Sequence, residues 1–406
     1  MNAADTVFVL ISAALVMLMT PGLALFYGGM VRSKNILSVL MQSFIILGII
    51  SLEWSLWGYT MAFGPDHGGI IGGLTMFGLK GVGMAPSPDY GTTIPHLAFM
   101  IFQCMFAIIT PALITGAFAE RMKFGAFILF TLLWATFVYN PLCHWVWGVG
   151  GWMGRLGALD FAGGTVVHIS SGISALAAVL LIGKRKGYGT TAFIPHNLPM
   201  TLTGAGLLWF GWFGFNAGSA LASNGLAANA FVVTHLASAA AAVSWVIFEW
   251  IHRGKPTTLG VASGAVAGLV AITPASGFVG PMSSIIIGFM GGALCYGGVL
   301  MKARLGYDDA LDVVGIHGVG GTWGALATGL FACTEINSAG ANGLFFGNAA
   351  QLWIQFVSVA ATMVFAFVMT YIILKFVDLV MGLRISDEEE IRGMDTTAHN
   401  EAGYSF

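Results

Sequence analysis

GGTVVHISSG, residues 163–172, and VVGIHGVGG, residues 313–321, each place one histidine deep inside an apolar segment of this sequence. An ionisable side chain in hydrocarbon is costly unless it lines a pathway or pairs with another polar group. His168 and His317 are therefore the first candidate functional residues, and the occurrence of two in the same setting strengthens that interpretation.

The composition around these segments is that of a membrane protein. Only 8% of the residues are charged, 57% are hydrophobic and the mean hydropathy is +0.84, values that exclude a soluble domain of 406 residues. The net charge of −2 gives no indication of a nucleic-acid partner. The four scattered cysteines form no metal-binding spacing, so we expect them to be small packing residues and expect no cofactor.

Apolar stretches of about 20 residues are long enough to cross roughly 30 Å of hydrocarbon as a helix. The sequence contains eleven, which predicts an all-α polytopic membrane domain over residues 1–384 and a polar tail over 385–406. The predicted spans are 6–29, 36–63, 95–119, 124–142, 163–183, 199–215, 226–250, 258–274, 281–301, 312–333 and 345–374.

Basic residues predict the orientation of these spans. If alternate connections face the cytoplasm, only Lys80 and Arg155 of the 16 basic residues fall on the outer side. The cytoplasmic side receives Arg32, Lys34, Arg121, Lys123, Lys184, Arg185, Lys186, Arg253, Lys255, Lys302, Arg304, Lys375, Arg384 and Arg392. This bias predicts a multi-pass protein of the cytoplasmic (inner) membrane, with the N-terminus outside and the C-terminus inside.

The two histidines divide the spans into two similar halves. The fifth span carries His168 and the tenth carries His317, so each half has five spans and must be inverted relative to the other. Such a five-plus-five repeat places a substrate path between the halves, near the midplane. The eleventh span stands outside the repeat. The tail after it, with the acidic run Asp387–Glu390, is either a solvated end or a segment that docks a partner.

Eight short motifs occur in a fixed order along the chain: PGLALFYGG, AFAERM, DFAGGTVVH, PHNLPM, GWFGFNAGS, RGKP, ITPASG and GIHGVGG. Together they resemble the ammonium transporter family (Amt/MEP/Rh), most closely its bacterial Amt branch, over essentially the whole chain. The resemblance implies a homotrimer with one narrow pore per subunit, which conducts ammonium or ammonia and accepts methylammonium as an analogue. It also implies a PII-type regulatory protein as a possible partner at the cytoplasmic face, and a transporter rather than an enzyme.

The resemblance assigns roles to particular residues. His168 and His317 correspond to the twin pore histidines; Phe106, Trp147 and Ser219 to the outer recruitment site; and Phe106 and Phe215 to a stacked phenyl gate. Aromatic faces attract a cation by about 0.5–2 kcal/mol each, and a serine hydroxyl accepts a hydrogen bond from it. A neutral pair of buried imidazoles could then hold a small polar guest and pass a proton.

Two aspartates are expected to support the histidine helices. Asp160 lies eight residues before His168, where its carboxylate could cap the helix by accepting from backbone N–H groups. Asp312, five residues before His317, would do likewise from the inner side.

Three other functions remain open at this level. The chain could transport a different small solute, or it could be an ammonium sensor that passes its state to a cytoplasmic partner. An intramembrane metalloenzyme would need His168, His317 and Asp160 as zinc ligands, but HExxH and similar ligand pairs are absent.

Overall fold

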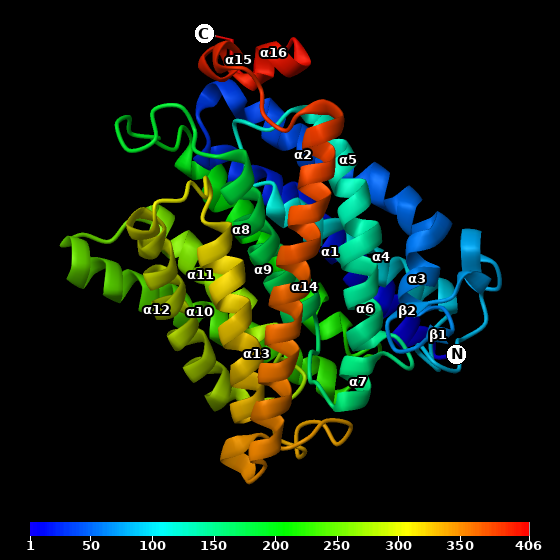
Figure 1. The fold of residues 1–406 in the computed structure, drawn as a ribbon. Helices are drawn as coiled ribbons and strands as arrows, with labels where there is room; N and C mark the ends of the chain where they lie inside the picture. The colour runs from blue at the N-terminus through cyan, green and yellow to red at the C-terminus, as the bar shows by residue number, and fades with distance from the viewer. Residues whose placement is uncertain (406) are drawn as a thin grey trace.

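The computed structural model describes residues 1–405 as a bundle of long helices (Figure 1). The longer helices are α1 (Ala3–Met30), α2 (Ile36–Glu53), α4 (His96–Ile114), α5 (Phe124–Trp134), α8 (Ser170–Ile182), α9 (Leu198–Gly218), α10 (Gly225–Arg253), α11 (Thr258–Ile272), α12 (Pro281–Leu305), α13 (Val319–Phe331) and α14 (Ala349–Met381). The shorter ones are α3 (Tyr59–Phe63), α6 (Asn140–Trp147), α7 (Trp152–Leu156), α15 (Asp387–Arg392) and α16 (Met394–His399).

The remaining elements are short. Four π-helical turns continue longer helices: η2 (Trp54–Gly58), η4 (Ala135–Tyr139), η5 (Gly164–Ile169) and η6 (Val314–Gly318). The 3-10 turns are η1 (Ser33–Asn35), η3 (Leu74–Leu79) and η7 (Leu344–Phe346). Strands β1 (Asp66–His67) and β2 (Ile71–Gly72) form a small antiparallel hairpin.

A helical segment lies in each of the eleven apolar ranges predicted from the sequence. Within residues 1–405, eight are long and apolar enough to cross a membrane, judged by length and composition alone. The other three ranges hold α9, α11 and the pair η6–α13. Helix α11 has only 15 residues, which is about 22 Å of helix, whereas the 33 residues of α14 extend about 50 Å.

The N-terminus and the C-terminus of the chain contact different sets of the segments that connect the helices. At the N-terminus, the backbone N–H of Asn2 donates to the carbonyl of Thr93 (2.6 Å), and Asp5 accepts from the backbone of Ser223 (2.8 Å). The C-terminal helices α15 and α16 cap one end of the bundle, while the β1–β2 hairpin and α7 lie toward the other (Figure 1). The connections therefore gather into two groups at opposite ends.

Glycines bring the corresponding helices of the two predicted halves close together. A Cβ at Gly204 of α9 would lie 2.2 Å from the backbone nitrogen of Phe26 in α1. A Cβ at Gly172 of α8 would lie 2.1 Å from the backbone nitrogen of Gly318 in η6. Small residues at such crossings allow helix backbones to touch in the absence of a hydrophobic driving force within lipid. The first and last helices of each half pack in this way.

Buried ion pairs tie together the connections at the C-terminal end. Glu120 pairs with Arg32 (2.8 Å) and Arg185 (3.2 Å), and Arg185 also pairs with Asp308 (2.8 Å). Burial alone would raise the pKa values of both carboxyls. The hydrogen bonds and charges of the neighbouring arginines outweigh burial and hold the pKa of Glu120 and of Asp308 below their ordinary values.

The tail is docked on its own chain rather than extended as a solvated end. Its residues Glu390, Met394 and Asp395 are no more than 2% exposed. The contacts that hold it are Arg384 with Glu390 (2.7 Å), the Lys186 backbone with Glu390 (2.6 Å), the Met394 backbone with Asn35 (2.8 Å), and the Ser38 backbone with Asp395 (3.0 Å). Helix α15 begins with a capping box formed by Ser386 and Glu389.

Candidate functional site

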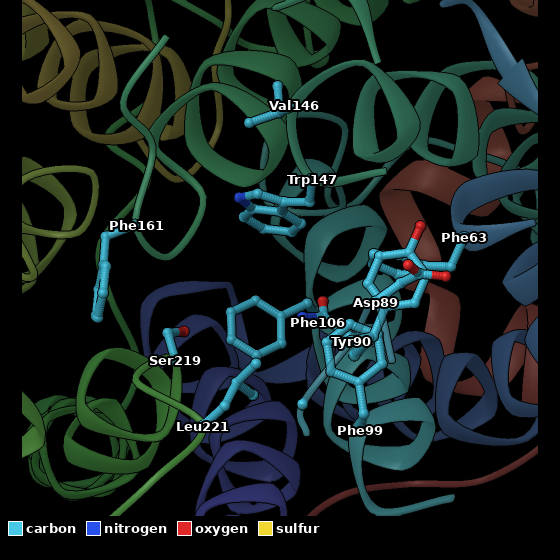
Figure 2. A pocket seen from close by; sticks show the side chains of 12 residues that line it. Phe63, Asp89, Tyr90, Phe99, Phe106, Val146, Trp147, Phe161, Ser219 and Leu221 are labelled. Carbon is cyan, nitrogen blue, oxygen red and sulfur yellow. The ribbon is translucent and has the colours of Figure 1, made fainter. Parts of the chain in front are cut away.

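A cavity of about 330 Å³ contains the three residues predicted to recruit the substrate. Phe106 comes from the middle of α4, Trp147 is the last residue of α6, and Ser219 follows the last residue of α9. Figure 2 shows the indole of Trp147 above the phenyl ring of Phe106, with Ser219 to one side. The two ring centroids are 6.0 Å apart, and the rings are nearly perpendicular at 85°.

The hydrogen-bond donors of Trp147 and Ser219 are both occupied within the protein, so these side chains present an aromatic face and a hydroxyl oxygen to a ligand. The indole Nε1–H of Trp147 donates to the carbonyl of Asp160 (2.8 Å), and the Ser219 hydroxyl donates to the carbonyl of Phe215 (2.9 Å). The hydroxyl oxygen of Ser219 keeps lone pairs to accept from a ligand, and the aromatic faces attract positive charge. The cavity therefore suits a small cation with N–H donors.

Two phenyl rings lie against each other at the inner side of this cavity, which Phe106 lines. The centroids of Phe106 and Phe215 are 4.2 Å apart, and the two side chains are 1% and 0% exposed. Nothing hydrated passes between rings at that separation without displacing one of them. The family resemblance assigned both rings to one gate, and that role stays a prediction; the structure shows the two rings in contact, tilted by 36°.

His168 and His317 meet directly beyond the phenyl rings. Their Nδ1 atoms are 3.3 Å apart, so one ring donates and the other accepts. His168 also stacks on Phe215 (6.2 Å between centroids) and on Trp212 (5.4 Å). Both imidazoles are at most 3% exposed, and within residues 1–405 the Nε2 of His168 has no hydrogen-bond partner. That atom is available to a polar guest.

The two histidines share an unusual backbone conformation. His168 lies in the π-helical turn η5 and His317 in the π-helical turn η6. Such turns are rare and occur frequently at functional sites, because the extra residue in the turn changes the direction in which side chains point. The periodicity of the sequence did not reveal them.

Glycine makes the approach of these two turns possible. In addition to the Gly172–Gly318 contact, a Cβ at Gly321 would lie 2.9 Å from the Cβ of His168. These glycines and Trp212 were not identified from the sequence. The signal available was that each histidine is followed within four residues by glycine, in HISSG and HGVGG.

Asp160 supports the helix that carries His168. The residue is 7% exposed, and its carboxylate accepts from the backbone N–H groups of Gly163 (2.7 Å), Gly164 (2.6 Å) and Thr165 (2.7 Å), and also from the Thr165 hydroxyl. The carboxylate satisfies the free N–H groups at the start of the helix.

Comparison with known proteins then places the chain in a family. The model of the Ammonium Transporter Family matches residues 7–404. This chain belongs to the ammonium transporter family.

Individual members of the ammonium transporter family match over nearly their full length. An ammonium transporter of Bacillus subtilis is 59% identical over 100% of this chain and 99% of that protein. Ammonium transporter Amt1 of Archaeoglobus fulgidus is 49% identical over 100% of both. The crystal structure of Candida albicans Mep2 has a TM-score of 0.90 at 37% identity, over 96% of this chain and 88% of that one. The chain is thus a polytopic all-α membrane transporter and not an enzyme.

Asp312 does not have the role we expected for it in this ammonium transporter. Its backbone is left-handed (φ 64°), and its carboxylate pairs with Lys302, away from the start of the His317 helix. Asp309 accepts from the backbone N–H of Val314 instead (2.7 Å). Asp309 precedes His317 by eight residues, the same spacing as Asp160 and His168, so the two halves are more alike than the choice of Asp312 implied.

Replacing Asp309 with alanine is expected to destabilise the ammonium transporter by about 1–2 kcal/mol, because the buried N–H of Val314 loses its acceptor. Thermal unfolding of the detergent-purified protein measures the loss. Asp312→Asn is the control, since asparagine tolerates the left-handed backbone and the Asp309–Val314 bond is retained. Because Asp312→Asn also weakens the ion pair with Lys302, the decisive result is that of Asp309→Ala, and unchanged stability in that variant would contradict the assignment of Asp309 as the cap.

Proposed function

We propose that this protein transports ammonium across the cytoplasmic membrane through a narrow apolar pore. The observation that carries the proposal is one unbroken series of rings. It begins at Trp147 and Phe106 and continues through Phe215 to His168 and His317. In this proposal the outer cavity binds the cation, the phenyl pair opens transiently, and the neutral molecule passes along the imidazoles.

Deprotonation is the step that makes the apolar path usable. Moving a bare cation of this size into a low-dielectric path costs on the order of 20 kcal/mol in the Born estimate. Removing a proton from an amine with a pKa of about 10 costs only about 4 kcal/mol at pH 7. Ammonia can therefore pass where potassium, which has no proton to lose, cannot.

The proposed topology has eleven spans, an inverted five-plus-five repeat, and the N-terminus outside. It is supported by the grouping of the connections at two ends. Arg32, Glu120, Arg185 and the docked tail lie at one end, whereas the N-terminus contacts Thr93 at the other. The glycine crossings between corresponding helices support the inverted repeat.

We further propose a homotrimer with one pore per subunit, in keeping with the family resemblance of the sequence. The end that carries the tail is the proposed docking face for a PII-type regulator. The tail offers solvent-accessible acidic groups there: the side chain of Asp387 is 63% exposed although it pairs with Lys186.

Replacing Trp147 with leucine is expected to raise the half-saturating ammonium concentration about fivefold without abolishing transport, through loss of a cation–π contact worth about 1 kcal/mol. Electrical recording from proteoliposomes after stepwise increases in ammonium concentration measures this half-saturating concentration. Trp147→Phe keeps an aromatic face and should shift the value less. Absence of ammonium-driven flux in the wild-type protein would refute the proposed function. Unchanged saturation in Trp147→Leu would remove Trp147 from the recruitment site.

A further inference from the structure

We propose that Asp89 and Gln103 form a waiting site for ammonium at the mouth of the cavity, outside the position held by Phe106, Trp147 and Ser219. The inference rests on the proposed function and adds to it a separate, earlier binding position. Both residues line the same cavity as the recruitment residues. In the view of Figure 2, Asp89 and Ser219 lie on opposite sides of Phe106.

Helix α4 sets the order of these residues along the path. Phe99, Gln103 and Phe106 are spaced four and three residues apart, so they lie on one face of the helix, and all three line the cavity. With a rise of 1.5 Å per residue, Gln103 lies about 4–5 Å nearer the start of α4 than Phe106. Gln103 therefore precedes the phenyl gate for a cation that follows this face from the mouth.

Asp89 is held at the level of Phe99 by a tightly bonded turn. The Ser87 hydroxyl accepts from the backbone N–H groups of Asp89 and Tyr90 (3.2 Å each). The Tyr90 ring stacks on Phe99 (5.1 Å, 14°), and its hydroxyl accepts from the backbone of Val149 (2.9 Å), two residues after Trp147. The turn thus positions Asp89 relative to both walls of the cavity.

The two side chains offer unused acceptors of two kinds. Asp89 is exposed, and its carboxylate has no hydrogen bond or ion pair with any of residues 1–405. The Oε1 atom of Gln103 is buried and likewise lacks a partner in the part of the chain that the structure describes. A full negative charge attracts a hydrated cation from a distance, whereas an amide oxygen accepts one N–H at close range. The ligand expected here is a small, partly hydrated cation with N–H donors.

The test measures ammonium-driven currents in proteoliposomes at low and high ionic strength. Asp89→Asn should raise the half-saturating concentration about two- to fourfold at 10 mM salt and not at 0.5 M, because salt screens exposed charges. Glu335→Gln is the matched control: it removes another exposed charge, from a different connection proposed to face outward, at a residue that does not line the cavity. Its half-saturating concentration should remain within the error of the wild type.

Gln103→Leu should raise the half-saturating concentration at least threefold at both ionic strengths, because it removes a short-range acceptor rather than a charge. An unchanged value in Asp89→Asn at low salt, or an equal shift in Glu335→Gln, would overturn the role of Asp89. A wild-type value in Gln103→Leu would overturn the waiting site. Loss of all ammonium current in the wild type would instead count against the proposed function, so the two failures are distinguishable.

Discussion

Replacing His168 and His317 together with alanine is expected to reduce ammonium transport no further than replacing either one alone, by at least about tenfold in each case. The two Nδ1 atoms are hydrogen-bonded to each other, so each ring fixes the tautomer of its partner. Residues that act as a unit give non-additive losses of this kind. Current and substrate flux after an ammonium jump, measured per reconstituted protein, report the loss.

His235→Ala is the matched control for the histidine pair. His235 is an exposed histidine of α10 whose ring lies tilted against that of Trp209 (5.4 Å between centroids) and takes no part in the series of rings. The His235→Ala variant should transport ammonium at close to the wild-type rate. If the double alanine variant kept wild-type flux and its discrimination against potassium, the two pore histidines would be packing residues and the proposed mechanism would be wrong.

A single methyl group at Gly172 is expected to cause the second large effect. In Gly172→Ala the new Cβ would lie 2.1 Å from the backbone nitrogen of Gly318, and a backbone atom cannot move aside as a flexible side chain does. Helix α8, which continues directly from η5, must move away from η6, and we expect the Nδ1–Nδ1 contact of the two histidines to be lost. We expect destabilisation at or above the upper end of the 1–3 kcal/mol typical of overpacking, with transport reduced at least tenfold in the protein that folds.

Gly48→Ala introduces the same methyl group at a helical glycine whose Cβ would meet nothing within 4 Å. This control should gain a little stability, since alanine is the better helix former. Thermal unfolding and ammonium currents of the two variants are compared side by side. Equal behaviour would show that the bundle absorbs the Gly172 methyl group, and that close backbone approach is not what joins the histidines.

The helical segments were predictable because lipid leaves a chain few options. Only a helix satisfies its own backbone groups in hydrocarbon, so an apolar stretch of sufficient length already implies one. The two histidines stood out for the same reason, since a polar side chain in such a stretch needs an explanation. The charges of Arg32 and Lys34 at one boundary indicated where a span ends.

Other features depend on three-dimensional contacts that composition does not record. The fourth span was expected to end at residue 142, but its helix continues through η4 and α6 to Trp147. Asp312, shortly upstream of His317, was the expected cap, whereas Asp309 is the residue whose carboxylate accepts from the backbone N–H of Val314. The eight-residue spacing shared with Asp160 was present in the sequence and would have identified Asp309.

Because the two histidines lie in π-helical turns, the contact between them depends on the direction in which the backbone points each side chain, as well as on the side chains themselves. Each π turn holds one residue more than an α turn, and one residue corresponds to about 100° of rotation around a helix axis. If η5 relaxed to α-helix, His168 would point away from His317 while every side chain stayed chemically the same. The proposed substrate path therefore requires one register of these two helices, and deleting one residue from either turn should disrupt it as severely as removing an imidazole.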